Sequence, residues 1–491
     1  MTTANFAAID LGAESGRCML GRFDGGTLQL EEIYRFPNIP VRVLDSLHWD
    51  PLRLFAEIKH GLELCARQSD HALSGIGIDT WGVDFALLGR DDELLGNPFH
   101  YRDRRTEGMM AKAFERVSRE EIFEHTGIQF MPINTLYMLL SMQGTPALEA
   151  AQTFLTMPDL FNFWLSGRKA CEFTNATTTQ LYDQRAGDWS KPLIEKLGLP
   201  SHIFTPVVQP GTMLGPILKS VGEEIGLAPV PVIAPACHDT GSAVAAVPAR
   251  VKDYAYISSG TWSIVGVETE SPIITPQSLA NNFTNEGGVA GTVRFSKNVM
   301  GLWLIQECRR AWAQSGETLD YADLTALAEQ AAPFVSFVDP DDEDFLRPGD
   351  MPARLREFCR KTGQSVPEDN GALLRCVFES LALKYRFVIE RIEAMLGQRL
   401  EVIHIVGGGS QNRFLCQLTA DATNRPVIAG PAEATALGNV LVQAMALGHF
   451  TSLAKAREVV QNSVELTNYE PDGSVGWEEA YGRFVKLVAH A

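Results

Sequence analysis

The sequence predicts an α/β protein made of two related domains that face a central cleft. Its 491 residues are too many for one hydrophobic core. Each half opens with a strand, a glycine-containing turn and a returning strand, at residues 6–23 and 254–266. Strand–loop–helix segments at residues 230–247 and 401–447 are typical of sheets covered by helices. We therefore expect one domain at residues 1–247 and a second at residues 248–491.

The composition is that of an ordinary globular protein with a strong negative charge. Hydrophobic residues make up 45% and charged residues 21% of the chain, and the net charge is −18 with a pI near 5.1. This charge argues against a nucleic-acid partner, because no basic face would neutralise the phosphates. We see no signal peptide and no apolar run of membrane-spanning length, so we expect no membrane partner. The eight cysteines lack metal-binding spacing and predict core thiols in a reducing cytoplasm, although pairing of Cys359 with Cys376 stays open.

The stretch from Val230 to Val247 places an acid where a strand gives way to a helix. An apolar run ending at Ala236 predicts a buried strand, Cys237–Gly241 predicts a turn, and Ser242 is expected to cap the helix. Ligands of open α/β sheets bind in the crevice at such strand ends. Asp239 can take a proton from a substrate hydroxyl there, or it can only cap the helix.

The first hairpin has a polar tip that suits a phosphate. Asp10 ends the first strand, and residues 13–17 form a tight turn that carries Arg17. Backbone N–H groups in such a tip can cradle a phosphate, and Arg17 adds positive charge. Asp10 is placed to hold a hydrated magnesium ion, which prefers one or two carboxylates. A plain hairpin without a ligand is the alternative.

Two other turns are candidates for ligand contact. Trp81 beside Gly82 at a strand end offers an apolar plate and space for a sugar, although Trp81 suits a core equally well. Three glycines in Gly407–Asn412, between a strand and a helix, let a flat ligand lie against bare backbone, or form a plain turn. Elsewhere, the polar residues 172–180 predict a loop and residues 297–312 an amphipathic helix.

Taken together, the motifs resemble the FGGY family of carbohydrate kinases over residues 6–447. Asp10–Gly12 is similar to the first phosphate loop, Ser258–Trp262 to the second, Gly407–Asn412 to the adenosine loop, and His238–Thr240 to the motif of the catalytic aspartate. The resemblance implies two ribonuclease H-like domains of the actin and hexokinase type around the cleft. It also implies ATP-dependent phosphorylation of a small-molecule sugar with Mg²⁺.

The resemblance further implies roles for individual residues. Asp239 is expected to be the catalytic base and Asp10 the magnesium ligand. The residues expected to contact ATP are Ala13, Glu14, Ser15, Gly16, Arg17, Thr261, Gln306 and Gly408. Those expected to contact the sugar are Gly82, His238, Asp239, Thr240 and Asn298, with Trp81 added for its apolar ring. Glu14 departs from the family pattern, which has a small serine there, because a carboxylate repels a triphosphate unless it turns outward.

The segments 77–85, 101–103, 127–130, 134–137 and 172–181 resemble those of FGGY kinases that act on a ketose. Their resemblance implies phosphorylation of L-rhamnulose at O1 in L-rhamnose breakdown. Kinases for L-fuculose or L-xylulose share the scaffold and are alternatives, because specificity rests on a few hydroxyl contacts. An actin-like ATP-binding switch protein is a third possibility, which the Trp81–Gly82 turn disfavours. The sequence leaves monomer or homodimer open.

Overall fold

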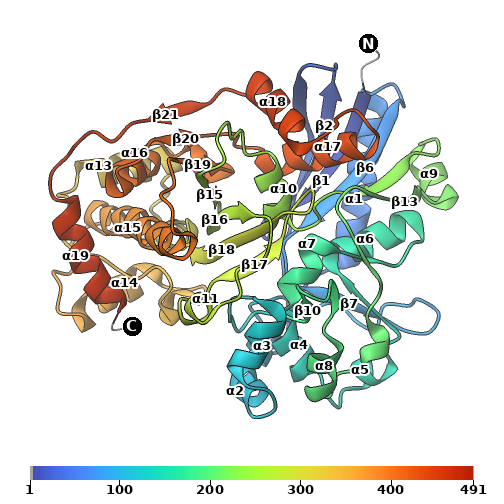
Figure 1. Cartoon of the computed structure of the whole chain (residues 1–491), viewed down its shortest axis with the longest axis horizontal. Helices are drawn as coiled ribbons and strands as arrows, with labels where there is room; N and C mark the ends of the chain where they lie inside the picture. The colour runs from blue at the N-terminus through green and yellow to red at the C-terminus, as the bar shows by residue number, and fades with distance from the viewer. Residues whose placement is uncertain (1–3, 490–491) are drawn as a thin grey trace. The chain divides into compact units, whose positions relative to one another are not determined.

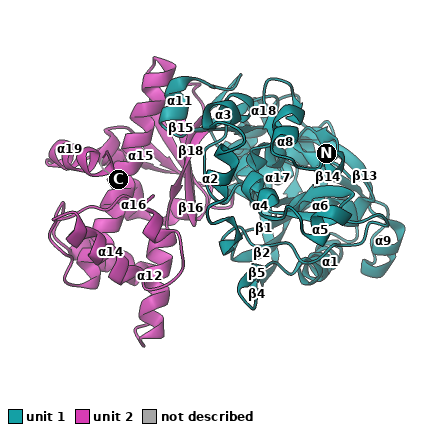
Figure 2. Ribbon diagram, turned by 90° about the horizontal axis from the view of Figure 1, so that it is seen from below, with its two compact units in different colours: residues 1–248, 268–295, 434–463 teal, residues 249–267, 296–433, 464–491 magenta. Residues whose placement is uncertain are grey.

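The computed structural model describes residues 4–489, which form two compact units (Figure 2). Unit 1 contains residues 4–248, 268–295 and 434–463, and unit 2 contains residues 249–267, 296–433 and 464–489. These units differ from a single division at residue 248, because two segments of the C-terminal half pack with the N-terminal half.

Unit 1 is built on a six-stranded sheet with the order β13-β14-β6-β1-β2-β3 (Figure 1). Its strands are β1 (Ala4–Leu11), β2 (Ser15–Phe23), β3 (Leu28–Pro37), β6 (Leu73–Thr80), β13 (Thr212–Pro216) and β14 (Pro231–Ala234). Strand β1 pairs with β2 in an antiparallel hairpin and with β6 in parallel. Strand β14 lies parallel to β6. The predicted first hairpin is confirmed.

Helices cover both faces of this sheet. On one face α1 (Pro51–Gln68) and α6 (Met157–Ser166) meet through Phe55 and Trp164, and Gly61 of α1 lies against Cys18 of β2. On the other face α17 (Ala434–Ala446) packs on β1 and β6, and Val440 lies against Gly21 of β2. Cys18 and Gly21 are three positions apart on β2 and therefore face opposite sides of the sheet. Helices α1 and α17 thus cover opposite faces. Helix α10 (Asp239–Ala245) packs against α17.

The other elements of unit 1 are mostly short. They are β4 (Val41–Val43), β5 (Ser46–His48), β7 (Phe85–Leu88), η1 (Arg104–Thr106), α2 (Met109–Phe114), α3 (Arg119–Thr126), α4 (Thr135–Ser141), α5 (Pro146–Ala150), β8 (Thr153–Thr156), β9 (Cys171–Glu172), α7 (Phe173–Ala176), η2 (Thr177–Thr179), β10 (Tyr182–Asp183), β11 (Asp188–Trp189), α8 (Lys191–Lys196), η3 (Ser201–Ile203), β12 (Val207–Val208), α9 (Lys219–Ile225), α11 (Pro276–Ala280), β17 (Thr284–Gly287) and α18 (Leu453–Ser463).

The second large sheet repeats the arrangement of the first. Its order is β17-β18-β16-β15-β19-β20-β21, with β15 (Tyr254–Ser259), β16 (Trp262–Thr269), β18 (Val293–Met300), β19 (Val402–Val406), β20 (Val427–Ala429) and β21 (Thr467–Tyr469). The hairpin β15–β16 is antiparallel, and β19 and β20 follow β15 in parallel. The same hairpin-plus-parallel-strands pattern in both sheets confirms the expectation of two related α/β folds.

Helices of unit 2 complete the fold. They are α12 (Trp303–Gln314), α13 (Tyr321–Gln330), η4 (Glu343–Phe345), α14 (Met351–Lys361), α15 (Asn370–Leu396), η5 (Gly408–Gln411), α16 (Arg413–Thr423) and α19 (Trp477–Val488). The unit boundary falls within β16 and β18.

Three local predictions are wrong. Helix α10 begins at Asp239 with His238 as its N-cap, so Ser242 lies inside the helix, where its hydroxyl donates to the carbonyl of Ala236. Residues 172–180 are buried, and residues 173–179 form α7 and η2, where the hydroxyls of Thr177 and Thr178 donate to the carbonyls of Thr174 and Asn175. Residues 297–300 end strand β18, and the predicted helix starts only at Trp303.

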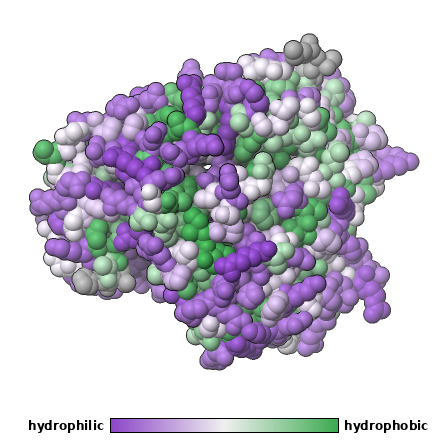
Figure 3. All heavy atoms as spheres, in the orientation of Figure 1, coloured by the Kyte–Doolittle hydropathy of each residue, from purple (hydrophilic) through white to green (hydrophobic). Residues whose placement is uncertain are grey.

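The largely polar surface and the buried cysteines agree with what the composition predicts. Polar side chains cover most of the face shown in Figure 3, with apolar side chains in narrower groups between them. Among the described residues, no helix is long and apolar enough to cross a membrane. All eight cysteines are buried and free, Cys359 and Cys376 included, as the prediction of core thiols requires.

Candidate active site

The turn between β14 and α10 is held from three sides. The Cys237 amide donates to Glu172 Oε2 at 2.9 Å, and the His238 amide donates to Thr174 Oγ1 at 3.0 Å. The Cys237 carbonyl accepts from the Thr80 amide at 2.9 Å. Burial raises the pKa of Glu172 to about 7, although hydrogen bonds from Thr174 and Cys237 oppose the rise. The turn therefore presents the next residue, Asp239, from a fixed backbone.

Asp239 is the first residue of α10 and keeps part of its side chain in solvent. Its Oδ1 accepts from the Thr240 amide at 2.5 Å and from Thr240 Oγ1 at 3.1 Å, and lies 3.4 Å from His238 Nε2. The side chain is 30% exposed. Burial raises the pKa of Asp239, the carboxylate of Asp10 raises it further, and the hydrogen bonds from Thr240 oppose the rise. A carboxylate with one occupied oxygen and a raised pKa suits a general base.

The β1–β2 hairpin brings Asp10 and Arg17 together. The two residues are direct partners in the antiparallel register, and Arg17 Nη2 forms an ion pair with Asp10 Oδ2. The Gly12 amide donates to the Ser15 carbonyl at 2.9 Å and closes the tip. Glu14 is exposed, so its carboxylate can turn away from the tip. Gly16 has no room for a side chain, because an added Cβ would lie 2.3 Å from the ring of Phe36.

A second buried carboxylate, Asp79, lies next to Asp10 in the parallel register of β1 and β6. Its Oδ2 accepts from Asn439 Nδ2 at 2.6 Å, while its buried Oδ1 has no hydrogen-bond partner. Burial and the charge of Asp10 raise the pKa of Asp79 well above its usual value. Carboxylate oxygens without nitrogen or sulfur ligands fit a hydrated magnesium ion, which needs only one or two of them. No described group of three or more acids, histidines or cysteines would hold a metal by itself.

Gly82 borders the side of the site where a sugar is expected. A Cβ at this position would lie 3.1 Å from Thr178 Cγ2 and 3.3 Å from His238 Nε2. Thr178 Oγ1 accepts from the amide of Val83 at 3.0 Å and holds the turn. Gly82 thus leaves a narrow space beside His238 that any larger residue would fill.

Trp81 is buried, with 6% of its surface exposed. Its ring lies 4.2 Å from that of Trp49, and both indole N–H groups donate to Asp84 Oδ2, at 2.9 and 2.5 Å. Burial raises the pKa of Asp84 to about 7, although the indole hydrogen bonds oppose the rise. This geometry matches the core alternative for Trp81, and its contact with a sugar stays a prediction.

In unit 2, three consecutive glycines follow β19 and differ in their surroundings. Gly407 has φ 83°, and a Cβ there would lie 2.9 Å from the Ser259 carbonyl. A Cβ at Gly409 would lie 2.0 Å from Ser259 Oγ. Gly408 is exposed, and no heavy atom lies within 4 Å of its added Cβ. Two of the glycines are thus needed for packing against β15, and Gly408 alone borders open space.

The β15–β16 turn and the start of α12 lie beside each other in unit 2. The Thr261 carbonyl accepts from the amides of Gly301 and Trp303, at 3.2 and 3.1 Å. Gln306 follows in the first turn of α12, and its buried Oε1 has no hydrogen-bond partner. Asn298 is half-buried on β18. The unpartnered amide oxygen of Gln306 is consistent with a ligand contact.

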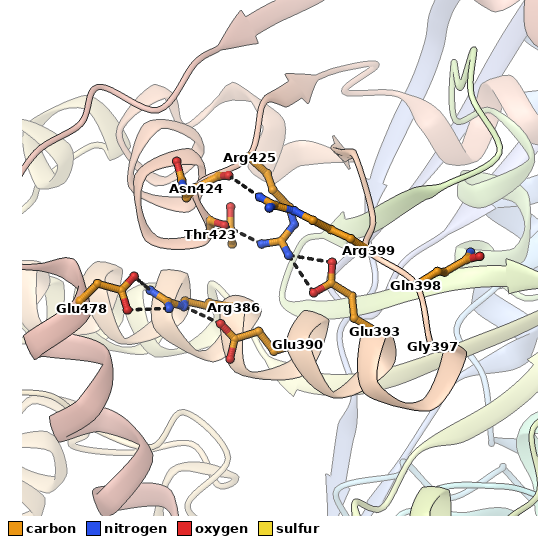
Figure 4. Close-up of a pocket in the computed structure, with 10 residues that line it drawn as sticks. All are labelled: Arg386, Glu390, Glu393, Gly397, Gln398, Arg399, Thr423, Asn424, Arg425 and Glu478. Atoms are coloured by element: carbon orange, nitrogen blue, oxygen red, sulfur yellow. Dashed lines mark hydrogen bonds and ion pairs between the residues drawn. The ribbon is translucent and has the colours of Figure 1, made fainter.

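A surface pocket of about 460 Å³ in unit 2 includes none of the predicted site residues (Figure 4). Arg386 pairs with Glu478 at 2.8 Å and with Glu390 at 2.8 Å, and Arg425 pairs with Glu393 at 2.7 Å. Arg386, Arg425 and the three glutamates are thus all engaged in these three ion pairs, so none of them is a free charge for a ligand.

The structure therefore gathers the predicted residues into two sets. Unit 1 holds those of the first phosphate loop, the Trp81–Gly82 turn and the catalytic turn, and unit 2 holds Thr261, Gln306, Gly408 and Asn298. Sequence reasoning missed Asp79 as a neighbour of Asp10, and it missed Glu286 and Arg294, which contact His238. No local pattern signals these contacts, because they join strands and turns far apart in the chain.

Comparison with known families defines the class of protein. The N-terminal domain model of the FGGY family of carbohydrate kinases matches residues 6–246, and the C-terminal domain model matches residues 255–447. The chain belongs to the FGGY family of carbohydrate kinases, and the resemblance found in the sequence is confirmed.

Individual relatives are similar over almost their whole length. The chain is 47% identical to a rhamnulokinase of Bacteroides thetaiotaomicron over 486 residues, covering 99% of both chains. It is 42% identical to a rhamnulokinase of Pectobacterium atrosepticum, covering 99% of this chain and 97% of the relative. Among solved structures, ligand-bound xylulose kinase of Lactobacillus acidophilus superposes with a TM-score of 0.81 at 17% identity, over 99% of this chain and 96% of that one. This likeness confirms the two-domain sugar-kinase fold.

Proposed function

We propose that this carbohydrate kinase transfers the γ-phosphoryl group of ATP to O1 of L-rhamnulose, in L-rhamnose breakdown. The observation that carries the proposal is the 40–47% identity to seven proteins named rhamnulokinase, over at least 94% of this chain. L-fuculose and L-xylulose kinases are the runner-up, because a few hydroxyl contacts separate ketose specificities. An actin-like switch protein is disfavoured by membership of a carbohydrate kinase family.

Asp239 is our candidate for the general base. Phosphoryl transfer needs positioning and neutralisation more than covalent chemistry. Asp239 Oδ1 is occupied by the two donors of Thr240, so Oδ2 is the oxygen that accepts the proton of the O1 hydroxyl. His238, Gly82, Thr240 and Asn298 are expected to position the sugar.

The phosphate loops hold the other substrate in this proposal. The tip from Ala13 to Arg17, together with Thr261, Gln306 and Gly408, binds ATP. Asp10 would hold Mg²⁺, and the ion would supply charge neutralisation for the triphosphate. Arg17 is paired with Asp10 in the structure, so it is expected to turn toward the phosphates when the ion binds.

We assign sugar binding, the first phosphate loop and the catalytic aspartate to residues 1–247, and ATP and adenosine binding to residues 248–491. We also place the enzyme in the cytoplasm, which the eight buried free thiols support, because reduced cysteines are typical of that compartment.

A sugar-dependent ADP-release assay tests the substrate. The purified chain is given Mg·ATP with L-rhamnulose, L-fuculose, L-xylulose or no sugar. We expect the highest kcat/KM with L-rhamnulose and little ADP release without sugar. A higher kcat/KM with another ketose would move the assignment to that sugar, and release independent of any sugar would contradict the kinase proposal.

A further inference from the structure

Arg294 is a fully buried cation close to the catalytic turn, on the part of β18 that belongs to unit 1. Its side chain is 0% exposed. Its Nε donates to the Gly287 carbonyl at 2.7 Å, and its Nη2 contacts Glu286 Oε2 at 3.1 Å and His238 Nδ1 at 2.9 Å. A buried guanidinium is retained only where its partners compensate for lost hydration. Here one of those partners is the residue before Asp239.

The contact with His238 determines which ring nitrogen carries the proton. A guanidinium has N–H donors and no acceptor, and Arg294 Nη2 lies closer to His238 Nδ1, at 2.9 Å, than Glu286 Oε2 does at 3.2 Å, so the closer contact gives Nδ1 the role of acceptor. The neutral imidazole then carries its proton on Nε2, which lies 3.4 Å from Asp239 Oδ1. The protonated nitrogen therefore lies beside the carboxylate.

Glu286 balances the charge of this arrangement. Its Oε2 lies 3.1 Å from Arg294 Nη2 and 3.2 Å from His238 Nδ1. Burial alone would raise the pKa of Glu286, but its surroundings, the charge of Arg294 first among them, lower it to about 2. Glu286 is thus an anion that holds the guanidinium in place, as orienting carboxylates do for catalytic histidines.

All the donors directed at Asp239 converge on one oxygen. The Thr240 amide and Thr240 Oγ1 both donate to Oδ1, and His238 Nε2 lies 3.4 Å from the same oxygen. We propose that Arg294 and Glu286 are positioning residues, which fix the Nε2–H form of His238 so that Asp239 offers Oδ2 to the sugar hydroxyl. This inference rests on the proposed function for its effect on rate, whereas the state of the imidazole stands on geometry alone.

The test measures the imidazole directly in the full chain without substrate. Histidine labelled with ¹⁵N is incorporated, and the His238 signals are assigned by their loss in His238→Gln. We expect an unprotonated Nδ1 and a protonated Nε2 in the wild type at neutral pH. A protonated Nδ1 in the wild type would overturn the inference whether or not the enzyme accepts L-rhamnulose, and so distinguishes its failure from failure of the substrate assignment.

Variants test whether the protonation state of the His238 imidazole affects the rate of phosphorylation of whichever ketose proves active. In Arg294→Met we expect Nδ1 to become protonated and donate to Glu286, and kcat to fall about 10- to 100-fold with a smaller change in KM. Arg294→Lys restores a donor and should recover part of both the signal and kcat. Glu286→Gln should also lower kcat, and it serves as a second variant if Arg294→Met does not fold.

Arg425→Met is the matched control, because Arg425 is also a buried arginine paired with a glutamate, in unit 2 and without a predicted site residue as partner. It should lower the melting temperature and leave kcat and the His238 signals unchanged. An Arg294→Met protein that keeps the wild-type His238 signals, or loses only as much kcat as the control, would refute the positioning role.

Discussion

The close packing of Gly438 of α17 against α10 predicts the effect of a larger residue at this position. Adding a methyl group to a helical glycine normally stabilises a helix by about 1 kcal/mol. Here the added Cβ would lie 1.8 Å from the Ser242 carbonyl oxygen of α10, where contacts below 3.0 Å are essentially never seen. Helices α17 and α10 would therefore have to separate by at least about 1.2 Å, which displaces the start of α10 at Asp239 relative to its surroundings.

The magnitude follows from this displacement. Overpacking costs about 1–3 kcal/mol, and a backbone contact at 1.8 Å belongs at the upper end, so after a helix gain of about 1 kcal/mol Gly438→Ala should lower the free energy of unfolding by about 2 kcal/mol. Misplacement of a reacting group by about 1 Å costs about 100-fold in rate, and we expect a loss of that order in kcat.

Calorimetry and the ADP-release assay, run well below the melting temperature, measure the two effects. Gly482→Ala in α19 is the control, because no heavy atom lies within 4 Å of its added Cβ. It should be neutral or stabilising by up to about 1 kcal/mol, with full activity. A Gly438→Ala protein with wild-type melting temperature and kcat would refute the reasoning.

Three other predictions concern the site in unit 1. Asp239→Asn should lower kcat about 10²- to 10⁴-fold, the usual contribution of a general base, and turnover within a few-fold of wild type would count against its role. Gly82→Val should raise KM for the ketose but not for ATP, because the new side chain fills the space beside Thr178 and His238; equal changes in both KM values would contradict a sugar contact. Because the folded pKa of Asp84 is raised to about 7, its contribution to stability is complete below about pH 4 and is lost as pH rises through 7. Asp84→Asn should flatten that part of the dependence of melting temperature on pH, and an unchanged slope would show that another group causes it.

The two hairpins and the glycine loop could be predicted because each depends on local pattern. Apolar strands on either side of a small-residue turn leave few alternatives, and Gly407–Gly409 lies between a β-branched strand and a helix. The position of Asp239 beside a helix start was also predictable, although Ser242 is not the cap.

The contacts that surround Asp239 could not be predicted, because they depend on tertiary packing. Glu172 belongs to a stretch whose composition predicts a loop, yet its buried carboxylate bonds to the amide of Cys237, 65 positions away. Glu286 and Arg294 lie in strands where charged residues normally face solvent. Only the fold shows that both are buried against His238.

The inaccessible sulfur atoms offer a way to follow motion in each half of the molecule separately. Cys18, Cys65, Cys171 and Cys237 lie in unit 1, and Cys308, Cys359, Cys376 and Cys416 lie in unit 2. An alkylating reagent can modify such a group only when the surrounding structure opens transiently. The rates at which peptides from the two units gain mass would therefore report how ATP and the ketose each change local opening of the unit that they are expected to contact.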